Sequence, residues 1–148
     1  MRSLASVIAT AGGIGFLRKG GGTAAAVAFC IAWWLLPMGY AWQAVLLIVL
    51  LAAGVWSASK METVWEHDSS RIVIDEVAGM MISVAFLPHT PGVIVTGLIL
   101  FRFFDILKPL GIGRAELLPR GWGVMGDDVL AGVYSQILVR VLVMTQLL

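Results

Sequence analysis

The sequence predicts an all-α protein, a polytopic membrane helical bundle with about four or five membrane segments. Of the 148 residues, 59% are hydrophobic and only 13% are charged, and the mean hydropathy is +0.94. Soluble domains are about 45–50% apolar and about 25% charged. The apolar residues also come in runs, and the charged residues gather in the short stretches between them. We therefore expect one membrane-embedded domain over residues 1–148.

The apolar runs define the expected membrane segments. The third of them is short, because about 20 helical residues are needed to cross a hydrocarbon core about 30 Å thick. The fourth carries Arg102 and Asp105 in its last turns, and the fifth contains Arg140. In chain order, the five segments are residues 23–36, 41–59, 72–87, 93–107 and 129–148.

The positions of Lys and Arg predict the orientation of these segments. The turns at residues 37–40 and 88–92 contain neither residue type, whereas both occur in the other connections, including an expected polar loop at 108–128. Cytoplasmic loops carry an excess of Lys and Arg. We therefore expect five crossings, with the N-terminus and every charged loop in the cytoplasm. A helix pair formed by 72–87 and 93–107 that enters the membrane without crossing it is the alternative.

The N-terminal part contains two further signals. Residues 9–11 form an A-x-A pattern like a signal-peptide cleavage site, but the apolar stretch before it is short and glycine-interrupted, so we expect it to remain in the mature protein. Residues 17–23, L-R-K-G-G-G-T, form a cationic glycine-rich turn before the first segment. Glycine allows close approach of the backbone to a ligand, and a helix N-terminus offers free N–H groups to an anion. A flexible interfacial loop is the alternative interpretation.

Acidic residues gather where apolar segments begin or end. Each has a local explanation: acids in a first helical turn favour the helix dipole or cap the helix, and Asp105 is spaced to pair with Arg102 or Lys108. Six such residues near a bilayer are nevertheless costly unless they pair or bind a cation. They are Asp68, Asp75, Glu76, Asp105, Asp127 and Asp128.

The residue types favour a divalent metal and phosphate at a membrane surface. Mg²⁺ prefers hard oxygen ligands, and it is usually held by one or two carboxylates together with substrate phosphate. The sequence has no cluster of Cys and His suited to zinc, no G-x-S-x-G motif for acyl transfer and no G-x-x-x-x-G-K-[ST] loop for nucleotides.

Four stretches, in this order and spacing, resemble the phosphatidylglycerophosphatase A family. They are G-G-I-G-F-L-R-K-G-G-G-T, H-D-S-S-R-I-V-I-D-E-V-A-G, F-R-F-F-D-I-L-K-P and G-W-G-V-M-G-D-D-V-L-A-G, and the likeness covers roughly residues 11–135. The resemblance implies a Mg²⁺-dependent lipid phosphatase of the bacterial inner membrane. Such an enzyme removes the terminal phosphate of phosphatidylglycerol phosphate at the cytoplasmic face. Its product, phosphatidylglycerol, serves the membrane and cardiolipin synthesis.

Together, the residues and the resemblance give a hypothesis for the site. We expect a metal shell of four carboxylates, with Asp68 and Asp105 as further ligands or supporting groups. Arg102 and Lys108 are expected to hold phosphate oxygens, and Thr23 is expected to contact phosphate through its hydroxyl group. The four expected metal ligands are Asp75, Glu76, Asp127 and Asp128.

Two other classes of protein are considered. A small cation- or proton-coupled transporter would use the same carboxylates as a relay, and this predicts acids at several membrane depths. A scaffolding membrane protein would use them only as helix caps and would have no metal-dependent activity. The position of the acids at segment ends on one expected side of the membrane favours the enzyme.

Overall fold

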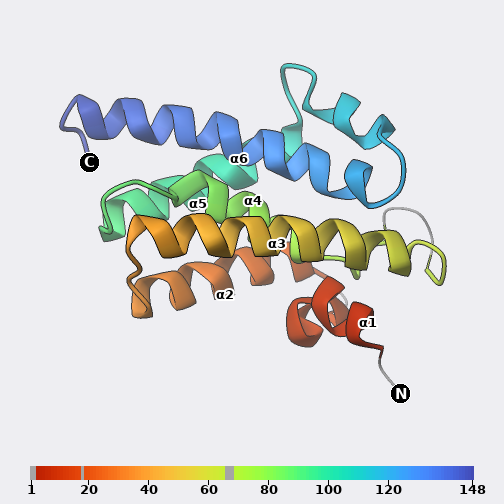
Figure 1. The fold of residues 1–148 in the computed structure, drawn as a ribbon. Helices are drawn as coiled ribbons and strands as arrows, with labels where there is room; N and C mark the ends of the chain where they lie inside the picture. The colour runs from red at the N-terminus through yellow and green to blue at the C-terminus, as the bar shows by residue number, and fades with distance from the viewer. Residues whose placement is uncertain (1–2, 18, 66–68) are drawn as a thin grey trace.

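The computed structural model describes residues 3–17, 19–65 and 69–148, and these residues are helical or lie in short connections, without any strand (Figure 1). The expectation of an all-α fold is confirmed. The helices are α1 (Leu4–Ala9), α2 (Gly21–Leu35), α3 (Tyr40–Met61), α4 (Ile74–Val84), α5 (Pro91–Leu107) and α6 (Gly121–Met144), with short 3-10 helices η1 (Ala11–Phe16) and η2 (Ile112–Leu117).

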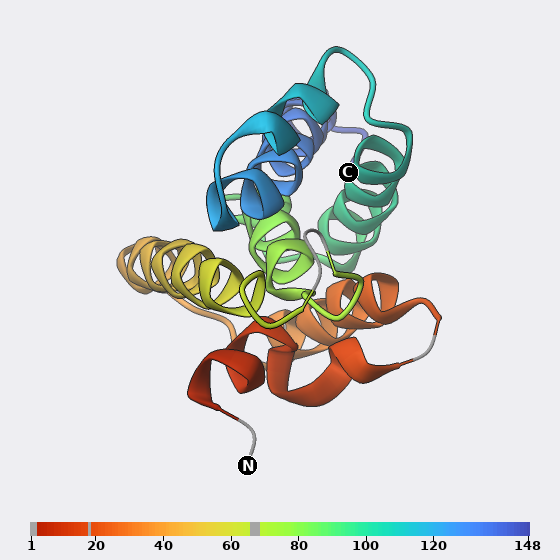
Figure 2. The same cartoon turned by 90° about the vertical axis from the view of Figure 1, so that its right-hand side faces the viewer.

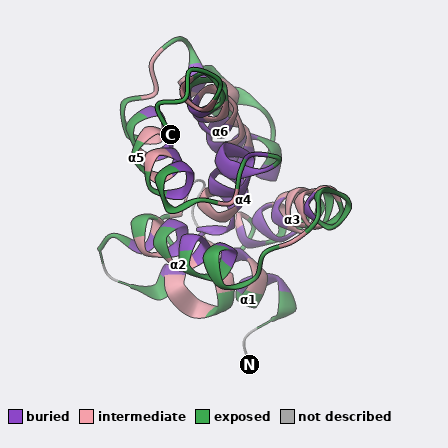
Figure 3. Ribbon diagram, turned by 90° about the vertical axis from the view of Figure 1, so that its left-hand side faces the viewer, coloured by how far each residue is buried: buried purple, intermediate pink, exposed green. Residues whose placement is uncertain are grey.

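Helix α4 is the centre of the bundle and packs against α2, α3, α5 and α6 (Figures 1 and 2). Nine of its eleven residues are buried, whereas the long helices around it bury only their inward faces (Figure 3). At 1.5 Å per residue, α4 is about 16 Å long, so the helix alone is shorter than a hydrocarbon core of about 30 Å. The expected third segment, residues 72–87, is therefore helical only in its middle part.

Local sequence signals explain two of the helix boundaries. The hydroxyl of Thr90 accepts a hydrogen bond from the N–H of Val93 at 3.3 Å, and Pro91 occupies the first position of α5. These are the usual signals of a helix start. Lys108 ends α5 in a left-handed conformation, with φ of 45°. The chain therefore turns away from the axis of α5 at Lys108, at the end of the bundle where α6 begins.

Two glycines set the close crossing of α4 and α6. A Cβ on Gly79 would lie 2.5 Å from the ring of Phe101 and 2.7 Å from the carbonyl oxygen of Asp128. A Cβ on Gly132 would lie 2.5 Å from the carbonyl oxygen of Gly79. Both helices run away from the same end of the bundle (Figure 1). The residues one turn before each glycine, Asp75 on α4 and Asp128 on α6, are therefore brought side by side.

The opposite end of the bundle is held by amide side chains. Gln43 of α3, which is buried, accepts a hydrogen bond from the N–H of Phe86 at 2.7 Å and donates one to the carbonyl of Met38 at 2.8 Å. Gln136 of α6 donates to the carbonyl of Ala85 at 2.7 Å. These bonds satisfy backbone groups just beyond the last turn of α4, where an apolar environment offers no water.

The last helix corrects one prediction. Residues 108–128 were expected to form a polar loop, but η2 lies within this stretch and α6 begins at Gly121, so residues 121–128 belong to the last helix. The N–H of Gly121 donates to the hydroxyl of Ser59 at 3.0 Å, and a Cβ at Gly121 would overlap Val55 and Ser59 of α3. This close contact with α3 sets the start of α6. Hydropathy does not reveal it, because the contact is made by a glycine and not by a run of apolar residues.

One described helix, α3, is long and apolar enough to cross a membrane by itself, and α2 is a shorter apolar helix. Large apolar side chains are exposed along the outer faces of α2, α3, α5 and α6, including Ile31, Ile48, Ile99 and Ile137. An exposed apolar surface of this kind is typical of contact with lipid or a partner. The number of crossings stays a prediction.

The glycine crossing generates a testable prediction. We expect Gly132→Ala to lower the midpoint of thermal unfolding in detergent, because the added Cβ overlaps the backbone of α4, and overpacking of this kind costs typically about 1–3 kcal/mol. Gly39→Ala is the matched control, because a Cβ there meets nothing within 4 Å. Equal unfolding midpoints for Gly132→Ala and the unchanged protein would contradict the close crossing.

Candidate active site

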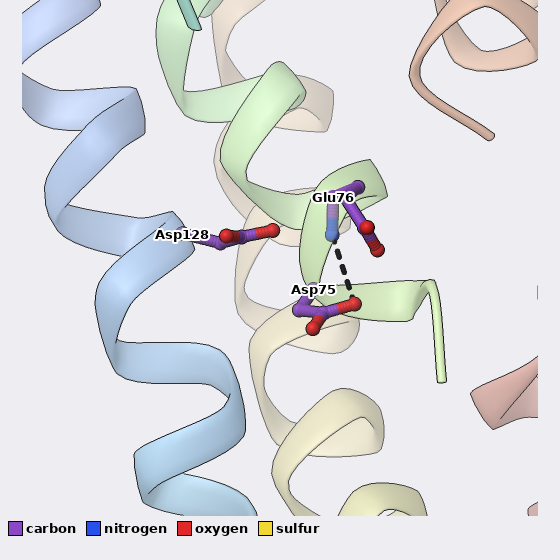
Figure 4. Close-up of side chains that lie close together, drawn as sticks. All are labelled: Asp75, Glu76 and Asp128. Carbon is purple, nitrogen blue, oxygen red and sulfur yellow. Dashed lines mark hydrogen bonds between the residues drawn. The ribbon is translucent and has the colours of Figure 1, made fainter. Parts of the chain in front are cut away.

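The first turn of α4 places two acids in the interior of the protein. Asp75 is 9% exposed and Glu76 is partly buried. The carboxylate of Asp75 accepts a hydrogen bond from the N–H of Glu76 at 3.1 Å (Figure 4). The prediction that both residues open a helix is confirmed. Dipole stabilisation accounts for acids at this position, but it does not account for their burial beside a third acid.

Asp127 and Asp128 lie in the second turn of α6, and both are buried. The alternative that they cap this helix is wrong, because Arg120 occupies the capping position. Asp128 extends from α6 towards the first turn of α4 (Figure 4). Asp127 extends to the end of α5, where its carboxylate accepts a hydrogen bond from Lys108 at 2.6 Å.

Helix α5 and the connection after it contribute the cations. Arg102 donates to Asp105 at 2.5 Å, as the spacing of three residues predicts. The alternative pair between Asp105 and Lys108 does not form in the structure. Lys108 instead bonds to Asp127 of α6 and to Glu116 of η2.

Five carboxylates therefore meet at one end of the bundle, in two overlapping groups. In each group, oxygen atoms of three residues lie within 4.8 Å of one another, and Asp128 belongs to both groups. The two groups are Asp75, Glu76 and Asp128, and Asp105, Asp127 and Asp128. We call these five residues the carboxylate cluster.

The carboxylate cluster fits a hard divalent cation. One oxygen of Asp128 (Oδ2) and one of Glu76 (Oε2) are buried without a hydrogen-bond partner, and Asp128 is only 3% exposed. A buried, ionised carboxylate is costly without a partner. The donor set contains only oxygen, which suits Mg²⁺. Of the expected metal ligands, all four belong to the cluster, together with Asp105.

Charge is balanced only at the edge of the cluster. The buried carboxylate of Asp127 accepts a hydrogen bond from Lys108. Burial alone would lower the pKa of Lys108, but the hydrogen bonds to Asp127 and Glu116 outweigh it and raise the pKa above its ordinary value. Lys108 is therefore charged at neutral pH. Its charge lies beside Asp127, whereas Asp128 has other acids as its neighbours.

The N-terminus of α2 completes the surroundings of the cluster. A Cβ on Gly22 would overlap the carboxylate of Glu76, so the backbone of α2 and this side chain are in close contact. Gly20 caps α2 without a side-chain hydrogen bond. Thr23, expected at the site, lies exposed in this first turn. Asp68, the remaining expected residue, lies outside the described residues.

Sequence reasoning missed Glu116 as a member of the site. Glu116 is 44% exposed at its side chain and lies in η2, between α5 and α6. It meets Lys108 because the chain turns back through left-handed residues at Lys108, Leu110 and Gly111. No helical spacing pairs residues 108 and 116, and the signals of this turn in the sequence are Pro109 and Gly111.

The fold and the site together define a helical protein with a buried acidic centre. The chain belongs to the phosphatidylglycerophosphatase A family, whose family model matches residues 7–143. The resemblance of the four sequence motifs to this family is thereby confirmed.

The chain is similar to three relatives, two of which carry the name of this family. A protein of Bacteroides thetaiotaomicron named "Putative phosphatidylinositol-3-phosphatase" is 42% identical over 144 residues, 91% of each chain. Phosphatidylglycerophosphatase A of Escherichia coli is 34% identical over 71% of this chain and 64% of its own length. The Haemophilus influenzae protein of the same name is 47% identical over 49% of this chain and 46% of its own. No solved structure matches the chain significantly.

The unbalanced charge of the cluster predicts opposite effects of two substitutions on stability. In EDTA, we expect Asp128→Asn to raise the thermal midpoint, because it removes one of several buried like charges. A gain of about 1 kcal/mol corresponds to roughly 2–4 °C for a chain of this size. Asp127→Asn is the matched comparison and is expected to lower the midpoint, because Lys108 loses its buried anionic partner. A lower midpoint for Asp128→Asn would contradict uncompensated repulsion.

Proposed function

We propose that the protein is a Mg²⁺-dependent phosphatase that removes the terminal phosphate from phosphatidylglycerol phosphate, giving phosphatidylglycerol at the cytoplasmic face of the membrane. The observation that carries this proposal is the pair of overlapping carboxylate groups that share Asp128, flanked by Arg102 and Lys108. Family membership supports the same class of reaction.

In this proposal, the carboxylate cluster holds the metal. Asp75, Glu76, Asp127 and Asp128 are the ligands, and Asp105 shares the second group. These residues would hold Mg²⁺, which would neutralise phosphate charge and lower the pKa of a water molecule in the site. The unpartnered oxygens of Glu76 and Asp128 supply the free lone pairs that such a cation needs.

Phosphate is received between the cations and the N-terminus of α2. Arg102 keeps one buried donor, Nε, without a partner, although another of its nitrogens is bound to Asp105. Lys108 is partly exposed and adds a charge next to Asp127. The first turn of α2 contacts Glu76 through Gly22, and its free N–H groups, with the exposed hydroxyl of Thr23 in the same turn, offer further donors.

The reaction replaces one P–O bond by another. An oxygen atom from water bonds to phosphorus, the bond between phosphorus and the glycerol oxygen breaks, and the glycerol oxygen takes up a proton. A carboxylate of the cluster accepts the proton that the attacking water loses. Arg102 and Lys108 hold the charge that develops on the phosphoryl oxygens.

We place the carboxylate cluster at the cytoplasmic surface of the membrane, with the long helices crossing the bilayer. Helices α2, α4 and α6 begin at the cluster end, and α3 and α5 end there (Figure 1). Lys60, Lys108 and Arg120 lie at this end, whereas the turns 36–39 and 85–90 at the opposite end carry no Lys or Arg. The positive-inside rule then supports an inner-membrane protein with its site facing the cytoplasm.

A second substrate is favoured by the name of one relative. The Bacteroides thetaiotaomicron protein matches most of this chain and is named for phosphatidylinositol 3-phosphate. Both lipids present a phosphomonoester on a glycerophospholipid headgroup, so the same cluster suits both. The ring of inositol and the short glycerol chain differ in size, and the contacts around the phosphate therefore decide between them.

An assay of phosphate release tests the proposed function. We expect the purified protein to release phosphate from phosphatidylglycerol phosphate with Mg²⁺ and not with EDTA. Phosphatidylinositol 3-phosphate, phosphatidic acid and a soluble phosphomonoester are compared at equal concentration. Asp75→Asn and Asp128→Asn are expected to lower kcat at least 100-fold, because each removes a ligand oxygen charge from the cluster. Phosphate release that EDTA does not reduce would rule out a requirement for a metal ion.

Arg140→Gln is the control variant, because Arg140 is exposed on α6, three turns beyond Asp128, and is expected to leave kcat unchanged. The transporter alternative predicts acids at several depths, whereas the buried acids of the described chain lie at one end. Cation or proton flux in liposomes, without phosphate release from any of the four compounds, would replace the phosphatase by that alternative.

A further inference from the structure

A large groove runs between α3 and α6, outside the carboxylate cluster. Its volume is about 870 Å³, and its lining is mostly apolar, with Leu51 and Val55 from α3 and Val129 from α6. Asp127 and Asp128 leave α6 towards α5 and α4, where Lys108 and Asp75 lie, and neither residue lines the groove. The groove is therefore a separate feature of the surface.

One end of the groove is cationic. Lys60 in the last turn of α3 and Arg120 just before α6 both line it and are both exposed. Neither has an ion-pair partner within the described ranges, in contrast to Arg102 and Lys108 at the cluster. Unpaired Lys and Arg beside an apolar surface favour an anion with an apolar body.

The groove has the dimensions and polarity of one lipid leaflet. From Ile48 to Lys60, α3 rises about 18 Å, close to half of a hydrocarbon core about 30 Å thick. Trp56 and Trp122 lie near the cationic end and are 44% and 61% exposed. Tryptophan is enriched at the level of lipid headgroups. The polar end, the aromatic level and the apolar part thus follow one another in the order found in a phospholipid.

We propose that this groove binds an anionic phospholipid as a second lipid site, with an acyl chain between α3 and α6 and the phosphate against Lys60 and Arg120. The proposal rests on the membrane placement in the proposed function, but not on the phosphatase reaction. The occupant is not the lipid being hydrolysed, because the groove contains none of the five carboxylates of the cluster.

Quenching of Trp122 tests the second site. The protein is reconstituted in phosphatidylcholine vesicles without Mg²⁺, and phosphatidylglycerol with brominated acyl chains is added. The signal of Trp122 is obtained by subtracting that of Trp122→Phe. We expect brominated phosphatidylglycerol to quench it at a much lower mole fraction than brominated phosphatidylcholine does, with roughly a fivefold preference for each of the two cations.

Two variants distinguish the contribution of the lipid headgroup to binding from that of the acyl chain. Lys60→Gln combined with Arg120→Gln is expected to abolish the preference for the anionic lipid, and Arg140→Gln is the charge control. Ala52→Phe fills the apolar part and should reduce quenching by both lipids, and Ile31→Phe on the exposed face of α2 is its size control. Equal quenching by the two lipids in the unchanged protein, or an unchanged preference in the double variant, would overturn the proposal.

The same experiment distinguishes this site from the proposed phosphatase. Asp128→Asn is expected to lose phosphate release but to keep the lipid preference at Trp122. A second copy of the chain is the other possible occupant. Loss of a dimer in detergent on Ala52→Phe, measured by light scattering, with lipid quenching unaffected, would assign the groove to that contact and overturn the lipid site.

Discussion

The close approach of α4 and α6 at Gly79 and Gly132 is the contact on which the site depends. Because neither position has a side chain, the two backbones come close together. Asp75 and Asp128 each lie one helical turn before one of these glycines, so carboxylate oxygens of the two residues lie within 4.8 Å of each other. In a membrane, where apolar side chains gain little by leaving lipid, small residues at a crossing are a main source of helix association. The same contact thus holds the bundle together and forces its acids together.

The carboxylate cluster works against the stability that this packing gives. Asp128 is nearly fully buried and has other acids as its neighbours, while charge compensation by Lys108 reaches only Asp127. Repulsion between buried acids of this kind is typical of functional sites, because the rest of the fold stabilises an arrangement that is unfavourable by itself. A cation that binds the cluster would stabilise the folded state while preparing it for phosphate.

The sequence predicted the helical class and singled out all five acids of the carboxylate cluster, because both follow from local patterns. Asp75 and Glu76 stand where a polar stretch meets an apolar run, which identifies a first helical turn. The start of α6 was misplaced, since hydropathy marks Val129, whereas the contact of Gly121 with Ser59 sets the true start. Glu116 depends on a left-handed turn and a partner eight residues away, and neither follows from periodicity.

Two glutamines hold the end of α4 that lies away from the carboxylate cluster. Gln43 and Gln136 bind the backbone on either side of the junction between Ala85 and Phe86, from two different helices. Bonds from two helices to the same peptide junction oppose movement of α4 along its own axis, and they thereby support the position of its first turn. The crossing at Gly79 and Gly132 and these two glutamine bonds together align Asp75 with Asp128, from two positions along α4.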